Sequence, residues 1–206
     1  MAHNDDTVTS GRTVPSPDSG QATRRRIIGA TIQCVAHHGV ADTSMAAIAA
    51  VGQVSKALLH YHFADRAQLL AQAAQELGDR LITREAGTLV GVEGRRAVDA
   101  VWLWVEGELV RGELRALVEL GTLRDPHIRM AVDLVRRRRR QQAALTAGEL
   151  FARLGLTPRV SVELLGDAHV VFLDGLSVDG TPSADDARVS FDVFWLALLG
   201  LVDQGD

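Results

Sequence analysis

The stretch from Thr43 to Phe63 constrains the fold of this chain more than any other. Apolar residues at helical spacing fill its first part, and Gly52 interrupts that pattern. A second short helix is predicted from about Ser55, with Leu59 and Phe63 one turn apart on its inner side. Two short helices joined by a tight turn indicate a helix-turn-helix, whose second helix enters the major groove of DNA.

The outward positions of the second helix are polar and basic. Ser55, Lys56, His60 and His62 occupy them. Lys56 is the only lysine and Tyr61 the only tyrosine of a chain that otherwise uses arginine for its positive charge. The presence of these polar and basic residues on one side of the helix favours a helix that contacts DNA.

The charge distribution also favours a DNA-binding head on a different body. A formal net charge of -4 argues against a protein that coats nucleic acid indiscriminately. From Gln21 to Arg66, five lysines and arginines stand against two aspartates, whereas the chain from Ala67 onward is net acidic. A sequence-selective DNA binder with a separate second domain shows this pattern. Chance asymmetry is the alternative.

The composition predicts a soluble globular protein, with 47% hydrophobic and 23% charged residues. The single cysteine excludes an intrachain disulfide and fits a reducing cytoplasm. No positive region followed by an apolar stretch marks a signal peptide. The longest apolar run, Val193 to Val202, is shorter than the ~20 residues of a membrane span. A cytoplasmic protein without membrane contact is therefore expected, and this run is predicted to be a helix buried in protein.

Residues 1–22 are rich in Asp, Thr, Ser, Gly and Pro, which predicts a disordered arm. A basic run, residues 23–26, then adjoins a first helix expected over Arg24 to His38, with Gly39 as its stop. The basic run can contact the phosphate backbone or the minor groove. Solvated charges at a helix start are an equal alternative.

Cys34, His37 and His38 form the one cluster that suggests a metal site. Their spacing permits metal binding, but no further ligands lie nearby in the sequence. Packing in the core or on the surface is the expected role. No metal and no cofactor is predicted.

Helix caps delimit the rest of the head. Thr43 or Ser44 can cap the first helix of the helix-turn-helix, and a hydroxyl there can also donate to a phosphate. Asp65 is expected to cap a long helix whose apolar positions begin at Leu69. Arg66, in the first turn of that helix, can face phosphate.

Together these motifs resemble the N-terminal DNA-binding domain of the TetR family of transcriptional regulators. The resemblance covers roughly Arg24 to Leu77, and the remaining chain is similar to the family in size and helical character. The segments that carry it are His38-Gly39, Thr43-Ser44-Met45, Ile48-Ala49, Val54-Ser55-Lys56, Leu59-His60-Tyr61-His62-Phe63, Asp65-Arg66 and Leu69-Leu70. The resemblance implies an all-α fold of about nine helices. Its parts would be the arm (1–22), a three-helix helix-turn-helix domain (23–70) and a ligand-binding and dimerisation domain (71–206).

The resemblance also implies DNA contacts residue by residue. The positions where family members contact phosphates hold Thr43, Ser44, Tyr61, His62 and Arg66, and Arg24 of the basic run joins them as a phosphate candidate. The positions that meet base edges hold Lys56, Ala57 and His60, with Ser55 close by. The chemistry agrees, because lysine can donate to guanine, histidine to a base acceptor, and alanine can contact a thymine methyl.

Two positions depart from the family pattern. The turn of the helix-turn-helix usually has Ala-Gly and here has Gly52-Gln53, so a slightly different turn geometry is expected. Leu58 stands where a hydroxyl often donates to a phosphate, so that contact is expected to be lost.

Helices are predicted to fill the body of the chain. They are expected over residues 95–110, 113–123, 126–154, 160–178 and 184–201. Five consecutive arginines, residues 136–140, circle the third of these helices and cannot all serve one partner. A solvated surface paired with acids is expected, with a second DNA contact or an anionic ligand site as the alternative.

The last two helices are predicted to form a dimer interface. The final helix is apolar nearly all round, and a helix with so little polar surface needs a partner. In the family these helices pair with their copies, which implies a two-fold dimer that reads half-sites roughly 34–36 Å apart on a near-palindromic operator. The residues expected in the interface are Leu164, Ala168, Phe172, Gly175, Val193, Leu196 and Gly200.

The ligand pocket is the part that the sequence defines least. Family members typically enclose an inducer between the DNA-binding head and the dimer bundle. The candidates for lining such a pocket are Trp102, Trp104, Glu106, Glu119, His127 and Met130. Since Trp102 and Trp104 are two residues apart, they point in different directions and only one is expected to line it. Plain core packing is the alternative for each candidate.

These features predict a transcriptional repressor that a small-molecule ligand releases from double-stranded DNA. The ligand would favour a conformation in which the recognition helices have the wrong spacing, a coupling of typically ~1–3 kcal/mol. An activator and a ligand-independent DNA-binding protein are alternatives. An enzyme is not expected, because no metal-spaced His/Glu motif, phosphate-binding glycine loop or nucleophile elbow is present in the sequence.

Overall fold

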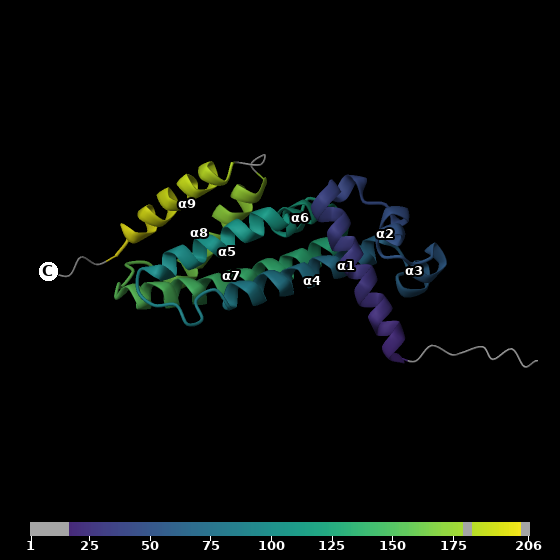
Figure 1. The fold of residues 1–206 in the computed structure, drawn as a ribbon, viewed down its shortest axis with the longest axis horizontal. Coiled ribbons are helices and arrows are strands. Elements are labelled where there is room, and N and C mark those ends of the chain that lie inside the picture. The colour runs from purple at the N-terminus through teal and green to yellow at the C-terminus, as the bar shows by residue number, and fades with distance from the viewer. Residues whose placement is uncertain (1–16, 179–182, 203–206) are drawn as a thin grey trace, which may run out of the picture.

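The computed structural model describes residues 17–178 and 183–202. Over these residues the chain forms nine helices and no strand, which confirms the predicted all-α class. The helices are α1 (Pro17–Asp42), α2 (Met45–Val51), α3 (Lys56–His62), α4 (Arg66–Ala86), α5 (Arg96–Arg111), α6 (Glu113–Leu120), α7 (Pro126–Leu154), α8 (Val162–Val178) and α9 (Ala184–Leu199). Figure 1 shows α1, α2 and α3 gathered at one end of an elongated body made by the other helices.

The first helix begins earlier than the sequence predicts. Residues 17–22, which were assigned to a disordered arm, are helical. Pro17 takes the first helical position, where the missing N–H costs no hydrogen bond. The rest of the predicted arm, residues 1–16, lies outside the described residues. The backbone leaves helical geometry at Gly39, with φ 79°, where the sequence predicts the stop.

Serine caps begin both helices of the helix-turn-helix. Ser44 Oγ accepts from the Ala47 amide at 3.1 Å, and Ser55 Oγ accepts from the Leu58 amide at 3.1 Å. Helices of seven residues are unstable alone. Packing of their inner faces, with Ile48 fully buried, therefore holds them in place.

In the turn between α2 and α3, Gly52 allows a close approach to α1, and Gln53 adopts the left-handed backbone conformation. Gly52 is buried, and a Cβ there would lie 3.3 Å from the Cβ of Ala30 and 3.1 Å from the carbonyl oxygen of Ile48. The absent side chain thus lets the turn approach α1. Gln53 has φ 50°, a left-handed conformation that costs a non-glycine residue about 1 kcal/mol. This division explains how a Gly-Gln turn replaces the usual Ala-Gly.

The long helices α4 and α7 approach closely because small residues separate them. A Cβ at Gly78 would lie 2.4 Å from a methyl carbon of Val135. Gly166 brings α8 equally close to α7, since a Cβ there would lie 2.5 Å from the Ala144 nitrogen. The apolar side predicted for α4 is buried as expected, namely Leu69, Leu70, Ala73, Leu77 and Leu81.

Acidic residues pair with four of the five arginines of residues 136–140. The pairs are Arg136–Asp133 at 3.7 Å, Arg138–Asp79 at 2.6 Å, Arg139–Asp174 at 2.7 Å and Arg140–Asp167 at 3.5 Å. The predicted acid pairing is confirmed. The predicted solvation is wrong for Arg139, which is 3% exposed because α8 packs over it.

The last two helices each bury one side and expose the other. Phe191 and Trp195 of α9 point into the core, whereas Val193 and Leu196 are 62% and 69% exposed. Within a single chain the helix is thus buried on one side only, and its other apolar side is left exposed, as the prediction that this helix needs a partner implies. Of the predicted interface residues, Leu164, Gly175, Val193, Leu196 and Gly200 are exposed and Ala168 and Phe172 are half-buried. Over residues 17–178 and 183–202, no helix is long and apolar enough to cross a membrane.

Candidate DNA-binding and ligand-binding sites

The outer face of α3 is open to solvent. Ser55, Lys56, Ala57 and His60, the predicted base-facing residues, are all exposed. Leu59, on the opposite face, is fully buried and anchors the helix. The sequence thus folds locally into a capped helix that presents one cationic and one imidazole donor on a single side.

The predicted phosphate contacts fall into two groups. Ser44 and Tyr61 are exposed, Tyr61 by 82%, and the edge of its ring meets His62 at 5.2 Å between ring centroids. Arg24 is half-buried, and its guanidinium lies 5.2 Å from the centre of the Phe63 ring. Tyr61 and His62 lie in the last turn of α3, Ser44 caps α2 and Arg24 lies on α1, and all four are at the surface or its margin.

The other two, Thr43 and Arg66, hold the head together. Thr43 is 2% exposed, and its hydroxyl donates to the carbonyl oxygen of Gly39 at 2.7 Å. Arg66 donates through Nε to the carbonyl of Thr43 at 3.1 Å and through a terminal nitrogen to that of Val40 at 2.6 Å. The Thr43 hydroxyl cannot reach a phosphate in this conformation, and Arg66 fixes the connection between α1 and α2, a role that the sequence did not predict.

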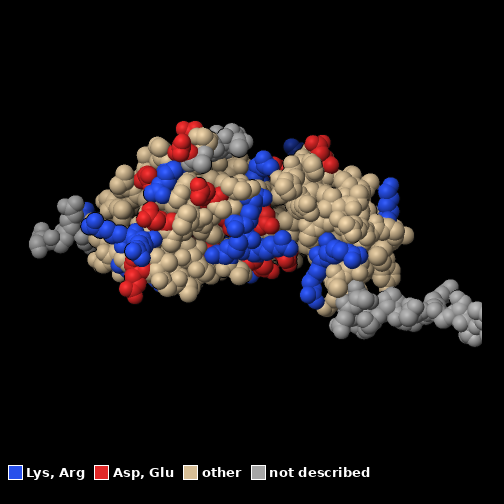
Figure 2. Space-filling model, viewed as in Figure 1, with Lys and Arg blue, Asp and Glu red and all other residues tan. Residues whose placement is uncertain are grey.

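The surface charge differs between the head and the body. On the face that Figure 2 shows, the head has separate basic patches and one acidic patch at its upper edge on a largely uncharged surface, whereas basic and acidic side chains alternate over the body. Separate basic groups attract phosphates, while alternating charges largely cancel at a distance. The head is therefore the end of the molecule that suits DNA.

Two residues of α6 hold the end of α1. Arg115 donates to the carbonyl oxygen of Ala36 at 2.7 Å, and Glu119 accepts from the Val40 amide at 3.0 Å. Arg115 and Glu119 also face each other at 3.8 Å. Gly112, which joins α5 to α6, lies so close that a Cβ would be 3.1 Å from the Ala36 oxygen. We call the Arg115 and Glu119 contacts the α6 clamp, because they connect the head to the body.

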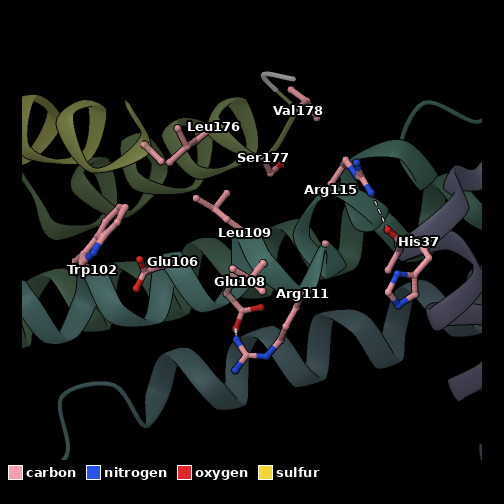
Figure 3. Close-up of a pocket in the computed structure, with 14 residues that line it drawn as sticks. His37, Trp102, Glu106, Glu108, Leu109, Arg111, Arg115, Leu176, Ser177 and Val178 are labelled. Atoms are coloured by element: carbon pink, nitrogen blue, oxygen red, sulfur yellow. Dashed lines mark hydrogen bonds and ion pairs between the residues drawn. The ribbon is translucent and has the colours of Figure 1, made fainter. Parts of the chain in front are cut away.

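A pocket of about 420 Å³ lies beside the α6 clamp, bordered by α1, α5, α6, α8 and α9 (Figure 3). Its size is ordinary for a small-molecule site. Its apolar lining includes Trp102, Leu109, Val110, Leu176 and Val178, and its polar lining includes His37, Glu106, Glu108, Arg111, Arg115 and Ser177.

The predicted ligand-pocket residues are not brought together. Trp102 lines the pocket, as does Glu106, whereas Trp104 stacks on His169 at 5.9 Å between ring centroids. Glu119 serves the α6 clamp. His127 and Met130 line a separate hollow between α4 and α7. Sequence reasoning missed Arg115 and Leu176, because only the packing of α6 and α8 on α5 brings them to this place.

One wall of the pocket is tied to α4 by an ion-pair network. Glu108 is 1% exposed and accepts from Arg84 through both carboxylate oxygens, at 2.6 and 2.7 Å. The same guanidinium donates to Glu113 at 2.6 Å. A two-point contact between a guanidinium and a buried carboxylate fixes geometry as well as charge. It joins α4, α5 and α6.

Two buried titratable groups lie near Arg139 in the body. Burial raises the pKa of Glu85 to about 7, and the positive charge of Arg139 partly offsets this. Burial, and then the same Arg139 charge, lower the pKa of His169 to about 4. Both ring nitrogens of His169 and one oxygen of Glu85 lack a hydrogen-bond partner among the described residues.

The described residues contain no group of three or more His, Cys, Asp and Glu side chains placed to hold a metal ion. Cys34 is buried, whereas His37 and His38 are exposed on α1. The three residues therefore do not converge on one point.

Comparison with known proteins finds one family that is similar to the head and several solved structures that share the fold. Residues 27–73 match the family described as bacterial regulatory proteins, tetR family. A transcriptional regulator from Saccharomonospora viridis in complex with choline shares the fold, with 21% identity, 89% of this chain and 100% of that chain covered, and a TM-score of 0.70. GusR from Salmonella enterica shares it with 22% identity, coverage of 92% and 98%, and a TM-score of 0.69. A TetR transcriptional regulator from Chloroflexus aurantiacus follows with 18% identity, coverage of 90% and 98%, and a TM-score of 0.70. No curated protein matches the sequence.

Proposed function

We propose that this chain, a DNA-binding transcriptional regulator of the TetR family by its N-terminal domain and its fold, is a repressor that a small molecule releases from a near-palindromic operator. Residues 23–70 would read DNA, and residues 71–206 would bind the ligand and dimerise. The open face of α3 supports the proposal best, because it presents Lys56 and His60 from a helix that Leu59 anchors.

Base recognition would come from Ser55, Lys56, Ala57 and His60. Phosphate contacts would come from Tyr61 and His62 at the end of α3, from Ser44 at the start of α2 and from Arg24 on α1. Arg66 would act indirectly, by fixing the connection between α1 and α2. Phosphate contacts set the register on the duplex, and base contacts set the sequence preference.

A second copy of the chain would cover the outer faces of α8 and α9. Leu164, Val193 and Leu196 are each more than half exposed there, although they are apolar. Contiguous exposed apolar surface marks an interaction site. The dimer would place two α3 helices on one side of the duplex, at the spacing of successive major grooves.

A small molecule would occupy the pocket beside the α6 clamp. The pocket borders both the body and the end of α1, so its contents can bias the position of the head. The choline complex of the Saccharomonospora protein supports a ligand-binding role for this fold. Release then requires only that the ligand prefer the conformation that fits DNA poorly.

Selection of bound sequences from random DNA tests this function. The protein is expected to enrich a near-palindrome, and Lys56→Ala is expected to lose roughly tenfold or more in affinity for it, with relaxed preference at one base pair of each half-site. Arg137→Ala, on α7, is the matched control for loss of one positive charge. Unchanged binding by both Lys56→Ala and His60→Ala would exclude α3 as the reading helix.

A further inference from the structure

The pocket beside the α6 clamp has unlike ends (Figure 3). Trp102 and Glu106, one turn apart on α5, stand at one end. Arg115 of α6 and His37 of α1 stand at the other. Apolar side chains such as Leu109 line the space between them. The pocket therefore has a carboxylate at one end and a guanidinium at the other, and Leu109 and the paired Glu108 and Arg111 lie between them.

Glu106 is the available carboxylate of this pocket. It is half-buried, and it makes no hydrogen bond or ion pair with any residue that the structure describes. Glu108, the other carboxylate of the lining, is already bound through both oxygens by Arg84. A carboxylate that faces the pocket without a protein partner is free to accept from a cationic donor of a ligand.

Arg115 is the basic counterpart. One of its nitrogens donates to the carbonyl of Ala36 at 2.7 Å, and its side chain is 43% exposed. A guanidinium has five N–H donors in a planar fork, so donors remain for a second acceptor. A carboxylate or another oxyanion is the acceptor that this fork fits best.

The charges of the lining balance. Glu108 is already paired with Arg84 and, at 3.4 Å, with Arg111, so one carboxylate, Glu106, and one guanidinium, Arg115, are left to face a ligand. A ligand with net charge would leave this balance unmet in a half-enclosed space, whereas a ligand with separated opposite charges would satisfy both ends.

We propose that this pocket binds an elongated zwitterion, with an ammonium group at Glu106, an apolar chain along Leu109 and an oxyanion on Arg115. This inference rests on the proposed function, since it names the class of ligand to which the regulator responds. It also gives the response a route. An oxyanion that binds the remaining donors of Arg115 would draw the guanidinium toward the pocket, which lengthens its bond to the carbonyl of Ala36 and so loosens the α6 clamp on the head.

A set of matched probes tests the ligand class on the full chain without DNA. They are ω-aminooctanoate, which has both charged ends, and octanoate and octylamine, which have one each. In calorimetric titrations, ω-aminooctanoate is expected to bind roughly tenfold or more tightly than either probe with one charge. Equal affinities, or no saturable binding at millimolar concentrations, would overturn the proposal.

Substitutions then assign the two ends. Glu106→Gln is expected to reduce the affinity for ω-aminooctanoate to that for octanoate, and Arg115→Gln to reduce it to that for octylamine. Glu93→Gln and Arg137→Gln, outside the pocket, are expected to leave it unchanged. Arg115→Lys keeps the charge without the planar fork and guards against a folding defect, and it is expected to bind ω-aminooctanoate more weakly than the wild type and more tightly than Arg115→Gln. Affinity that survives both pocket substitutions contradicts the assignment.

The two proposals fail in different experiments. Titration of the selected DNA without any probe tests the reading helix alone, and the probe titrations test the pocket alone. With both intact, ω-aminooctanoate is expected to weaken DNA binding by the wild type roughly tenfold, and octylamine is expected to have no effect. Probe binding that leaves DNA affinity unchanged would overturn the route through Arg115 while leaving the ligand class in place.

Discussion

The head and the body of this protein place their polar groups in opposite ways. In the head, Ser44 and Ser55 cap short helices at the surface, and Lys56 and His60 point into solvent. In the body, charged groups are buried between helices, and Arg139 with its ion pair is the clearest case. The head leaves Lys56 and His60 free for a partner and uses Thr43 and Arg66 to hold itself together, whereas the body uses buried ion pairs to fix the relative positions of its helices.

The comparison separates the polar groups that contribute to DNA recognition from those that contribute to folding stability. A polar group at the surface contributes little to folding and much to recognition. A polar group in the interior contributes to folding through its partner, and leaving that partner unpaired is costly. Substitutions of surface polar groups in the head should therefore change DNA binding, and substitutions of buried polar groups in the body should change the free energy of unfolding.

The largest loss of stability is expected at Arg139. Arg139→Met leaves the Asp174 carboxylate without its partner at 2.7 Å, in a site where the arginine is nearly inaccessible. We expect a loss of about 3 kcal/mol in the free energy of unfolding, measured in urea at fixed protein concentration. Arg138→Met breaks the exposed pair with Asp79 and should cost less than about 1 kcal/mol. Equal losses would mean that burial does not separate the two arginines.

Adding Asp174→Asn to Arg139→Met provides the internal check. It removes the charge left unpaired, so part of the lost stability should return. A further loss instead would show that Asp174 is stabilised by solvent and not by Arg139.

The same contrast explains what the sequence could predict. The cap at Asp65 was predicted, and so was a cap at Thr43 or Ser44, of which the structure shows Ser44, because a cap depends on residues three positions apart. The cap at Ser55 was not predicted, although the second helix was expected to begin there. Arg139 is indistinguishable from its four neighbours in the sequence, and only the packing of α8 on α7 decides which arginine is buried. Local sequence patterns thus predict where helices begin, but not which side chains the packing of helices buries.

The pocket was less predictable for the same reason. Trp102 and Glu106 were named from the sequence, but their place depends on Arg115, Leu176 and the end of α1, which come from distant parts of the chain. Glu119 was expected in a pocket and instead binds the Val40 amide, a contact that spans two domains. No periodicity within a single helix carries such information.

A second expected effect concerns the pH dependence of stability in the body. Glu85 has a folded pKa of about 7 against an ordinary 4.5, so its contribution to stability is complete below pH 4.5 and is lost as the pH rises to 7. His169 has a folded pKa of about 4 against 6.5, so its contribution is complete above pH 6.5 and is lost as the pH falls to 4. Between pH 4.5 and 6.5 the two slopes oppose each other.

Single substitutions should separate these slopes. Relative to the wild type, Glu85→Gln should gain stability with rising pH, and His169→Phe should lose it, each by up to about 1.4 kcal/mol per pH unit. Free energies of unfolding measured between pH 4.5 and 6.5 test both expectations. If the unfolding free energies of the two variants changed with pH in parallel, burial would not shift the pKa of Glu85 upward and that of His169 downward. The exposed His60 of the head, substituted by Phe, serves as the control.

The smallest expected effect is in the turn of the head, where a local rule is broken. Gln53→Gly removes a side chain from a residue at φ 50°, and it should raise the free energy of unfolding by about 1 kcal/mol in urea denaturation. Gly52→Ala should lower it, because the new Cβ would lie 3.3 Å from that of Ala30. If the two substitutions changed stability in the same direction, the division of tasks in this turn would be wrong. Changes of opposite sign in the free energy of unfolding would show that backbone geometry decides which residue fits at Gly52 and at Gln53. In the body, by contrast, buried ion pairs such as Arg139–Asp174 decide the effect of a substitution.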